Sequence, residues 1–290
     1  MKKVFVFVCV VVMMLSIAVP AFALSAGEKR VTIGADLTED QVKQIYSDFG
    51  LTRGDVTEIK VTNAEERKYL EGLVSDSKIG HVALSCTYIM TLDEGEGLSV
   101  STKNINYCTE EMYKNALTTA GITDASVMVS APREVSGTAA LTGIYKAYED
   151  MTGESLNSVA KKVGAEELVV TGDLAQVIGS TDASAIVNQL KQILDQAATM
   201  SDDELRTEIK KIAKQYGQDL TDSQVEQLLS LVRSMQGLDT KQLEQRIKSL
   251  QDTYKTANSV GSFFSDFGKK VSDFFKSVGD FFTNLFGGNK

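Results

Sequence analysis

"DASVMVSAPREVSGTAALTGIYKAYEDMTG" (residues 124–153) contains a strand and a helix in direct succession. Its first part is rich in β-branched and small residues and reaches Pro132, which cannot donate to a β-ladder, so we predict that the strand ends there. From Ser136 onward the pattern is helical as far as Gly153, and glycine commonly ends helices. A strand that leads directly into a helix favours a fold in which helices pack on a sheet.

The residues on the N-terminal side of this stretch show the same mixture. Residues 80–92 and 98–108 flank the turn DEGEG and predict a β-hairpin with Leu92 opposite Leu98. We predict two further strands and three helices, at residues 30–35 and 56–62 and at residues 37–50, 64–74 and 109–121. The order β-α-β-α-β-β-α-β-α predicts an α+β domain over residues 24–152, with helices packed on a small mixed sheet.

The second half of the chain is predicted to be all helical. The short β-rich run ELVVTG (residues 167–172) is more simply part of a helix. Further on, one apolar stripe at helical spacing consists of Ile186, Val187, Leu190, Ile193, Leu194 and Ala197. The only prolines are Pro20 and Pro132, so nothing of that kind interrupts helices over residues 153–258, where we expect a helical array or bundle.

The first 23 residues have the pattern of a secretory signal peptide. A basic head with Lys2 and Lys3 precedes an apolar run, and Ala21 and Ala23 occupy the two positions that a signal peptidase reads. The alternative is an uncleaved anchor helix, but the run is shorter than the roughly 20 residues that a spanning helix needs. We therefore predict cleavage after Ala23 and a secreted, extracellular protein.

The charge of the chain is acidic. Loss of the leader with Lys2 and Lys3 would take the net charge from −9 to −11. Nucleic acids bind basic surfaces, so this balance argues against a nucleic-acid partner.

Two cysteines, Cys86 and Cys108, would remain in the exported chain, where an even pair suggests a disulfide. In the predicted hairpin register, however, the two share a face with an offset of four residues, roughly 13 Å, and a disulfide needs Cα atoms about 4.4–6.8 Å apart. A bulge or a turn at Thr109 could close that gap. The sequence leaves the bond open.

The sequence contains little that indicates catalysis. His81 is the single histidine, which excludes most histidine-based metal sites, and two cysteines are too few for a four-thiolate zinc site. There is no nucleophile elbow and no phosphate-binding glycine motif. We therefore predict a protein that is not an enzyme, with no catalytic residues, no bound metal and no cofactor.

One helix start merits weighing as an anion site. Ser136, Gly137 and Thr138 open the helix after Pro132, and the free N–H groups of a helix start can bind an anion, with Arg133 as a charge partner. The alternative is a plain helix start packed closely on the sheet, and the absence of a phosphate-binding motif favours it.

Several long stretches of the chain resemble a known family. They are VTIGADLTEDQ (31–41), NALTTAGITDASVMVSAPREVSGTAALTGIYKAYEDMTGESL (115–156) and AEELVVTGDLAQVIG (165–179). These stretches are similar to the YpuA-like family of secreted Firmicute proteins, which is classified as a domain of unknown function. The resemblance implies an exported protein of a Gram-positive bacterium and a single unit from about Val31 to about Ile193. It brings no catalytic residues.

The last thirty residues hold eight of the twelve phenylalanines. On a helix, one continuous apolar seam would consist of Phe264, Phe267, Val271, Phe274, Val278, Phe281 and Leu285. Burying a phenylalanine is worth roughly 1.5–3 kcal/mol, so this seam must meet an apolar surface. That surface is a lipid interface, the protein's own helical half or another copy of the tail, residues 259–290.

Two hypotheses for function follow. The first is an exported, non-enzymatic protein of the cell envelope that contacts a membrane or another apolar surface through its amphipathic C-terminal helix, or associates with itself there. The alternative is an extracellular hydrolase or ligand-binding domain with the tail packed as part of the fold. The alternative predicts a concave polar pocket near Arg133 and Ser136.

Overall fold

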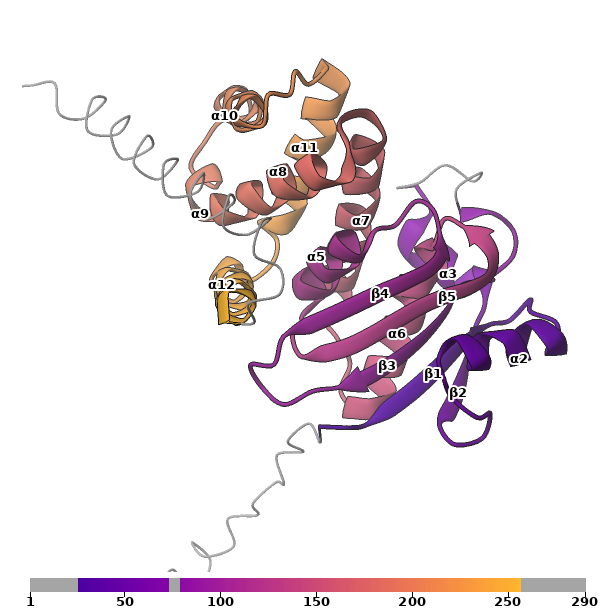
Figure 1. Cartoon of the computed structure of the whole chain (residues 1–290). Coiled ribbons are helices and arrows are strands. Elements are labelled where there is room, and N and C mark those ends of the chain that lie inside the picture. The colour runs from indigo at the N-terminus through magenta and orange to yellow at the C-terminus, as the bar shows by residue number, and fades with distance from the viewer. Residues whose placement is uncertain (1–25, 73–78, 257–290) are drawn as a thin grey trace, which may run out of the picture.

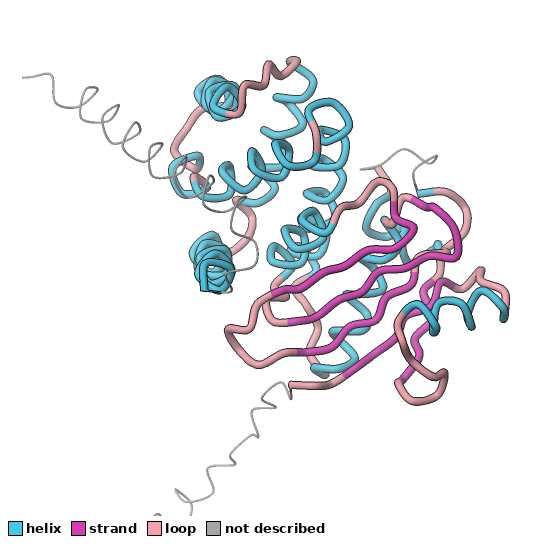
Figure 2. Tube along the Cα trace, in the orientation of Figure 1, coloured by secondary structure: helices cyan, strands magenta, loops and turns pink. Residues whose placement is uncertain are grey.

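The computed structural model of the chain describes residues 26–72 and 79–256, with side chains as far as residue 250. Figures 1 and 2 show a twisted sheet with helices on its faces and a group of helices beyond it. The strands are β1 (Lys29–Gly34), β2 (Thr57–Val61), β3 (Cys86–Thr91), β4 (Leu98–Ile105) and β5 (Ala125–Val135). The helices are α2 (Glu39–Asp48), α3 (Asn63–Leu70), α5 (Glu110–Ala120), α6 (Thr138–Thr152), α7 (Ser158–Ile178), α8 (Ser180–Gln192), α9 (Leu194–Ala197), α10 (Asp202–Gln215), α11 (Asp222–Met235) and α12 (Thr240–Thr256). The predicted fold class, an α+β region followed by helices, is confirmed.

The five strands form one mixed sheet in the order β2-β1-β3-β5-β4. β1 pairs with β2 and β4 with β5 in parallel, whereas β3 is antiparallel to both β1 and β5. Each parallel pair is joined through a helix, α2 or α5, because a parallel connection must cross back over the sheet.

The predicted hairpin between β3 and β4 is wrong, because β5 lies between these two strands. The turn after β3 is attached to the start of β5. Asp124 Oδ1 accepts hydrogen bonds from the backbone N–H groups of Gly95 and Gly97 at 2.9 and 2.8 Å. The same side chain therefore holds the turn beside β5, and β4 leaves the turn on the far side of that strand.

β5 also continues beyond Pro132, where we predicted that it ends. The pairing of β5 with β3 stops at Ser130. On that side no described strand residue lies opposite Pro132, so the N–H that proline lacks is not needed for a hydrogen bond. On the other side, the register with β4 shifts between Lys103 and Ile105. Asn104, at this irregularity, has a φ of 58° and donates from Nδ2 to the Ala131 carbonyl at 2.7 Å. The chain thus passes a proline within a central strand at a β-bulge.

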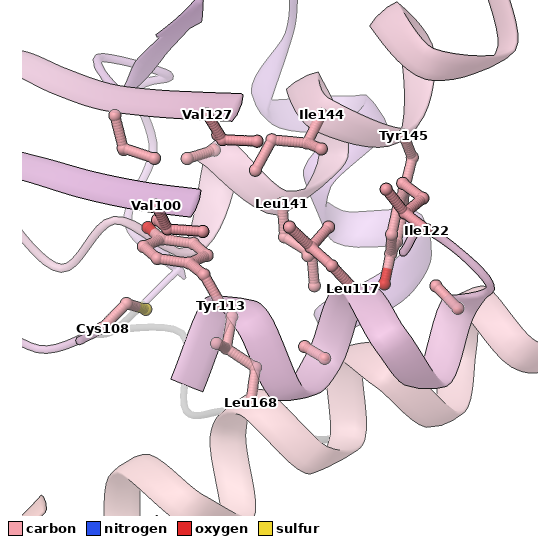
Figure 3. Close-up of a cluster of buried hydrophobic side chains, with 14 of the residues drawn as sticks. Val100, Cys108, Tyr113, Leu117, Ile122, Val127, Leu141, Ile144, Tyr145 and Leu168 are labelled. Carbon is pink, nitrogen blue, oxygen red and sulfur yellow. The ribbon is translucent and has the colours of Figure 1, made fainter. Parts of the chain in front are cut away.

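Two apolar cores lie on opposite faces of the sheet. The larger core contains α5, α6 and the inward side chains of β3, β4 and β5, and Figure 3 shows its centre around Tyr113, Leu117, Leu141 and Ile144. The smaller core packs α2 against β1, with Ile45 and Val31 fully buried. Helices thus cover one face of the sheet, and α2 covers part of the other, where Ser99 and Ser101 of β4 stay exposed.

Cys86 and Cys108 are both free and buried in the structure, so the disulfide is not formed. Cys86 belongs to the smaller core and Cys108 to the larger one, on opposite faces of the sheet. The shared face that we predicted depended on a hairpin that does not exist. Burial raises the pKa of each thiol to about 12, which keeps both thiols protonated at neutral pH.

The helical half packs on the sheet domain through α7. This helix contacts α5 on one side and α8 and α11 on the other, and it contains the ELVVTG run, as predicted. A third core, formed by α7 to α12, includes the predicted stripe residues Ile186, Leu190 and Leu194. α7 is therefore shared by two cores and joins the two halves of the molecule.

A buried ion pair lies where α5, α7 and α8 meet. Lys191 Nζ of α8 lies 2.5 Å from Glu167 Oε1 of α7, and the two side chains are 1% and 0% exposed. Thr119 of α5 donates to the other carboxylate oxygen of Glu167 at 2.5 Å, and Lys191 also donates to the Asn115 carbonyl at 3.1 Å. Desolvation lowers the pKa of Lys191, and the charge of Glu167 only partly offsets that effect.

The predicted leader with Ala21 and Ala23, and the Phe-rich tail with its seam from Phe264 to Leu285, lie outside the described residues. Within residues 26–72 and 79–256, no helix has the length and apolar character needed to cross a membrane. The signal peptide, the domain boundary at residues 152–153 and the amphipathic tail stay predictions.

Candidate ligand-binding cleft

A cleft of about 410 Å³ lies at the start of α6, where the end of β5, α3 and α7 approach one another. Its lining includes Arg133, Ser136 and Thr138, so the concave polar site that the alternative hypothesis predicted is present. The other residues of the wall are Glu66, Ile79, Gly80, Val82, Leu84, Ser85, Asn106, Tyr107, Glu134, Val135, Ala139 and Gln176.

Glu66 is the buried charged group of this cleft. The residue lies on α3 and is only 1% exposed. Its Oε1 accepts a hydrogen bond from the Thr138 hydroxyl at 2.7 Å, and its Oε2 accepts one from Asn63 Nδ2 at 3.3 Å. The Ser136 hydroxyl lies 3.2 Å from that of Thr138. A short polar chain thus runs from Ser136 through Thr138 to the carboxyl group.

The N-terminal cap of α3 leaves Asn63 available for this contact. Thr62 caps the helix by a reciprocal pair of hydrogen bonds with Glu65, a capping box. Asn63 is the first residue of the helix, and its amide donates to Glu66 and to the Gly80 carbonyl. α3 is therefore tied to the segment that forms the opposite wall of the cleft.

Burial raises the pKa of Glu66 to about 7. Desolvation of the carboxylate is the main cause. The hydrogen bonds from Thr138 and Asn63 and the positive charge of Arg67 act in the opposite direction and offset part of it. The group therefore changes protonation near neutral pH.

The four residues of the predicted anion site have different roles. Arg133, Ser136 and Thr138 all line the cleft, and Arg133 is exposed beside Glu134. Gly137 takes part through its backbone, because its carbonyl accepts a hydrogen bond from Tyr113 Oη at 2.6 Å. Its φ of 92° favours glycine, and a Cβ at this position would lie only 2.5 Å from Tyr113 Oη. The acidic group at this helix start is the protein's own Glu66 carboxyl. It accepts the hydrogen bond of the Thr138 hydroxyl, which is therefore not available to a bound anion.

Sequence reasoning missed Glu66, because an acidic residue near a helix start needs no explanation beyond the helix dipole. Its spacing carried a signal nevertheless. Glu66 precedes Leu70 by four residues, and residues four apart share one face of a helix. Leu70 is 1% exposed, so Glu66 lies on the buried face of α3.

The comparisons with known proteins cover both halves of the structure. Residues 33–253 match the family described as "Protein of unknown function (DUF1002)". The chain belongs to this family. It is also 37% identical over 243 residues to the uncharacterized protein YpuA of Bacillus subtilis (strain 168), covering 82% of this chain and 83% of that protein. No solved structure matches. The resemblance to the YpuA-like family is thus confirmed.

In this DUF1002 chain, the family match runs across residues 152–153 and includes both walls of the cleft. Tyr107, after β4, joins the walls. Its hydroxyl lies within hydrogen-bond distance of two acceptors on α7, Asp173 Oδ1 at 2.9 Å and the Val169 carbonyl at 3.0 Å, which share its one proton. Gly172 permits this contact, because a Cβ there would lie 2.4 Å from the tyrosine ring. The helical half thus takes part in building the site.

Metal-binding side chains do not gather in the described part of this DUF1002 protein, where no group of three or more His, Cys, Asp or Glu residues could hold a metal ion. His81 is exposed and precedes β3, so its expected position on a strand is wrong. The DUF1002 cleft therefore offers hydroxyl, amide, carboxyl and guanidinium groups as its chemistry.

Proposed function

We propose that this protein is exported and binds a small polar ligand in the cleft around Glu66, without catalysing a reaction. The observation that carries the proposal is a concave site with a buried carboxyl group as its centre. Its volume of about 410 Å³ lies within the roughly 300–1,000 Å³ typical of small-ligand sites. Export rests on the predicted leader, residues 1–23.

The arrangement of the hydroxyl groups favours binding over catalysis. A hydrolase needs an accessible nucleophile held against a base. The Thr138 hydroxyl donates to Glu66 and lies beside the Ser136 hydroxyl. That hydrogen bond orients the carboxyl group, and among the described residues the hydroxyl contacts no histidine or lysine that would complete a catalytic set. The cleft is therefore better suited to recognition.

The cleft hypothesis is tested by nuclear magnetic resonance on residues 24–290. We expect that compounds from a panel of primary amines, neutral alcohols and carboxylates shift the backbone amide signals of Gly80, Ser136 and Thr138. Ser136→Phe should fill the cleft and weaken binding by about tenfold or more, which corresponds to about 1.4 kcal/mol. The size-matched control is Ser99→Phe, at an exposed position of β4, which should bind as the wild type does. If no compound of the panel shifts these signals, the cleft is not a ligand site.

A second function, contact of the tail with a membrane surface, is supported by the apolar residues of the chain. Among the described residues, the exposed large apolar side chains are Val82, Val159 and Val177. Val82 lines the cleft, and the other two belong to α7. Three scattered valines do not match a seam of Phe264, Phe267, Phe274 and Phe281, so we propose a lipid interface for it, with association between copies as the alternative.

Liposome flotation tests this second function. Residues 24–290 should float with vesicles, whereas a chain that ends at Ser259 should stay at the bottom of the gradient. Phe267→Ser, Phe274→Ser and Phe281→Ser in one chain should abolish flotation, because each removes a large apolar contact. The matched control changes three serines of the same segment, Ser265, Ser272 and Ser277, to alanine. Unchanged flotation and unchanged oligomer size in the phenylalanine variant would refute contact through the seam.

A further inference from the structure

We infer that the cleft takes a ligand with a protonated amine, which the carboxylate of Glu66 binds as an ion pair. This inference rests on the proposed function of the cleft and specifies the chemical class of its ligand. It depends on three observations: the unused acceptor capacity of Glu66, the absence of a cation paired with it among the described residues, and the charge at the mouth of the cleft.

The carboxylate of Glu66 has acceptor positions to spare. An ionised carboxylate accepts hydrogen bonds at about four positions and donates none. The described residues supply two donors, Thr138 to Oε1 and Asn63 to Oε2. A ligand that completes the set must therefore bring N–H or O–H donors, and an ammonium group brings three.

Charge distinguishes Glu66 from the other glutamate that is buried in the described residues. Glu167 lies against Lys191 at 2.5 Å. Glu66 forms no ion pair with any described residue, and the nearby Arg67 directs its guanidinium to Asn63 Oδ1 and the Gly80 carbonyl, at 3.1 and 2.9 Å. A buried charge without a partner is costly, which an incoming cation would relieve.

The same geometry disfavours an anionic ligand. The Thr138 hydroxyl, which an anion would use at the start of α6, is occupied by Glu66. Arg133 is exposed at the cleft and lies next to Glu134, whose charge opposes its own. Among the described lining residues, the buried ionisable group is therefore an acid, and the exposed charges of Arg133 and Glu134 have opposite signs.

The number of protons released or taken up on binding tests this inference independently of affinity. Since burial raises the pKa of Glu66 to about 7, some of the carboxyl groups carry a proton at neutral pH in the empty protein. An ammonium ligand binds the ionised form and therefore releases protons at neutral pH. A neutral or anionic ligand that accepts a hydrogen bond from the protonated carboxyl takes up protons instead.

The experiment compares three probes with the same five-carbon chain: 1,5-diaminopentane, 1,5-pentanediol and glutarate. Titrations of residues 24–290 followed by nuclear magnetic resonance measure the shifts of the backbone amide signals of Gly80, Ser136 and Thr138. Calorimetry in buffers of different ionisation enthalpy measures how many protons are released or taken up on binding. We expect 1,5-diaminopentane to bind with proton release, and Glu66→Gln to weaken it at least tenfold. Glu94→Gln removes an exposed carboxylate from the turn after β3, outside the cleft, and should change the affinity less than about twofold.

The outcomes separate the inference from the proposed function. If pentanediol, glutarate or another non-cationic compound of the panel shifts the cleft amides and the amine does not, the inference is overturned and the binding function stands. Amine binding that survives Glu66→Gln, or that takes up protons in the wild-type protein, also overturns it. If no compound of the panel shifts those amides, both fall together. The proton count needs no variant, so it decides the question even if Glu66→Gln fails to fold.

Discussion

Lys191→Met is expected to destabilise the protein by about 3–5 kcal/mol, because it leaves the carboxylate of Glu167 buried without a counter-charge. Both side chains are at most 1% exposed, so water cannot replace the missing partner. The contact joins α7 to α8, and Thr119 links the same carboxylate to α5. Urea denaturation followed by circular dichroism measures the loss as a lower midpoint with an unchanged slope.

A second substitution shows whether the charge itself is the cause. Glu167→Gln in addition to Lys191→Met removes the stranded charge and keeps an acceptor for Thr119, so we expect it to restore most of the stability. The control is Lys43→Met, since Lys43 and its partner Asp40 are 73% and 92% exposed, and it should scarcely move the midpoint. If the double variant is no more stable than Lys191→Met, the loss comes from packing and not from charge.

Glu66→Gln should make the protein more stable than the wild type at pH 8, by roughly 3 kcal/mol, with the difference vanishing below about pH 4.5. The folded protein holds the Glu66 proton more tightly than the unfolded chain, because burial raises its pKa to about 7 from 4.5. The stabilisation that the neutral carboxyl gives is therefore complete at low pH and is lost as the pH rises through 7. Glutamine stays neutral throughout and does not lose it.

Denaturation at a series of pH values, for the variant and the wild type in parallel, measures this difference. Other groups titrate equally in both proteins and cancel. Glu134→Gln serves as the control, because it removes an exposed carboxyl group in place of the buried one. A constant difference between Glu66→Gln and the wild type from pH 5 to pH 8 would show that Glu66 does not titrate near neutrality in the folded protein.

The sequence predicted the elements of the fold far better than their pairing. Helix starts have local chemistry, and Thr38, Ser201 and Thr221 cap their helices with the reciprocal hydrogen bonds that their spacing indicates. Strand partners have no such local signal. A turn such as DEGEG indicates that the chain reverses but not which strand fills the gap, and here the partner comes from more than twenty residues later.

The candidate site was only partly predictable for a related reason. Arg133, Ser136 and Thr138 stand together in the sequence at a recognisable strand-to-helix junction, and the structure places them at the cleft. Glu66 comes from a distant helix and meets them through the order of the strands. Its spacing from Leu70 places it on the buried face of α3, but no spacing within α3 specifies its contact with Thr138 of α6. An interpretation based on the junction residues therefore located the cleft but not its buried carboxyl group.

The central position of β5 also determines when the domain can assemble during synthesis. When the ribosome has made residues up to about 120, the strands β2, β1 and β3 can pair, but β4 has no neighbour, since it pairs with β5. The larger core lacks its middle strand and the whole of α6 at that stage. Non-local pairing is slow, and here it must also wait for residues 125–135 to emerge. A nascent chain of this protein thus remains open until its last strand joins two separate pieces into one sheet.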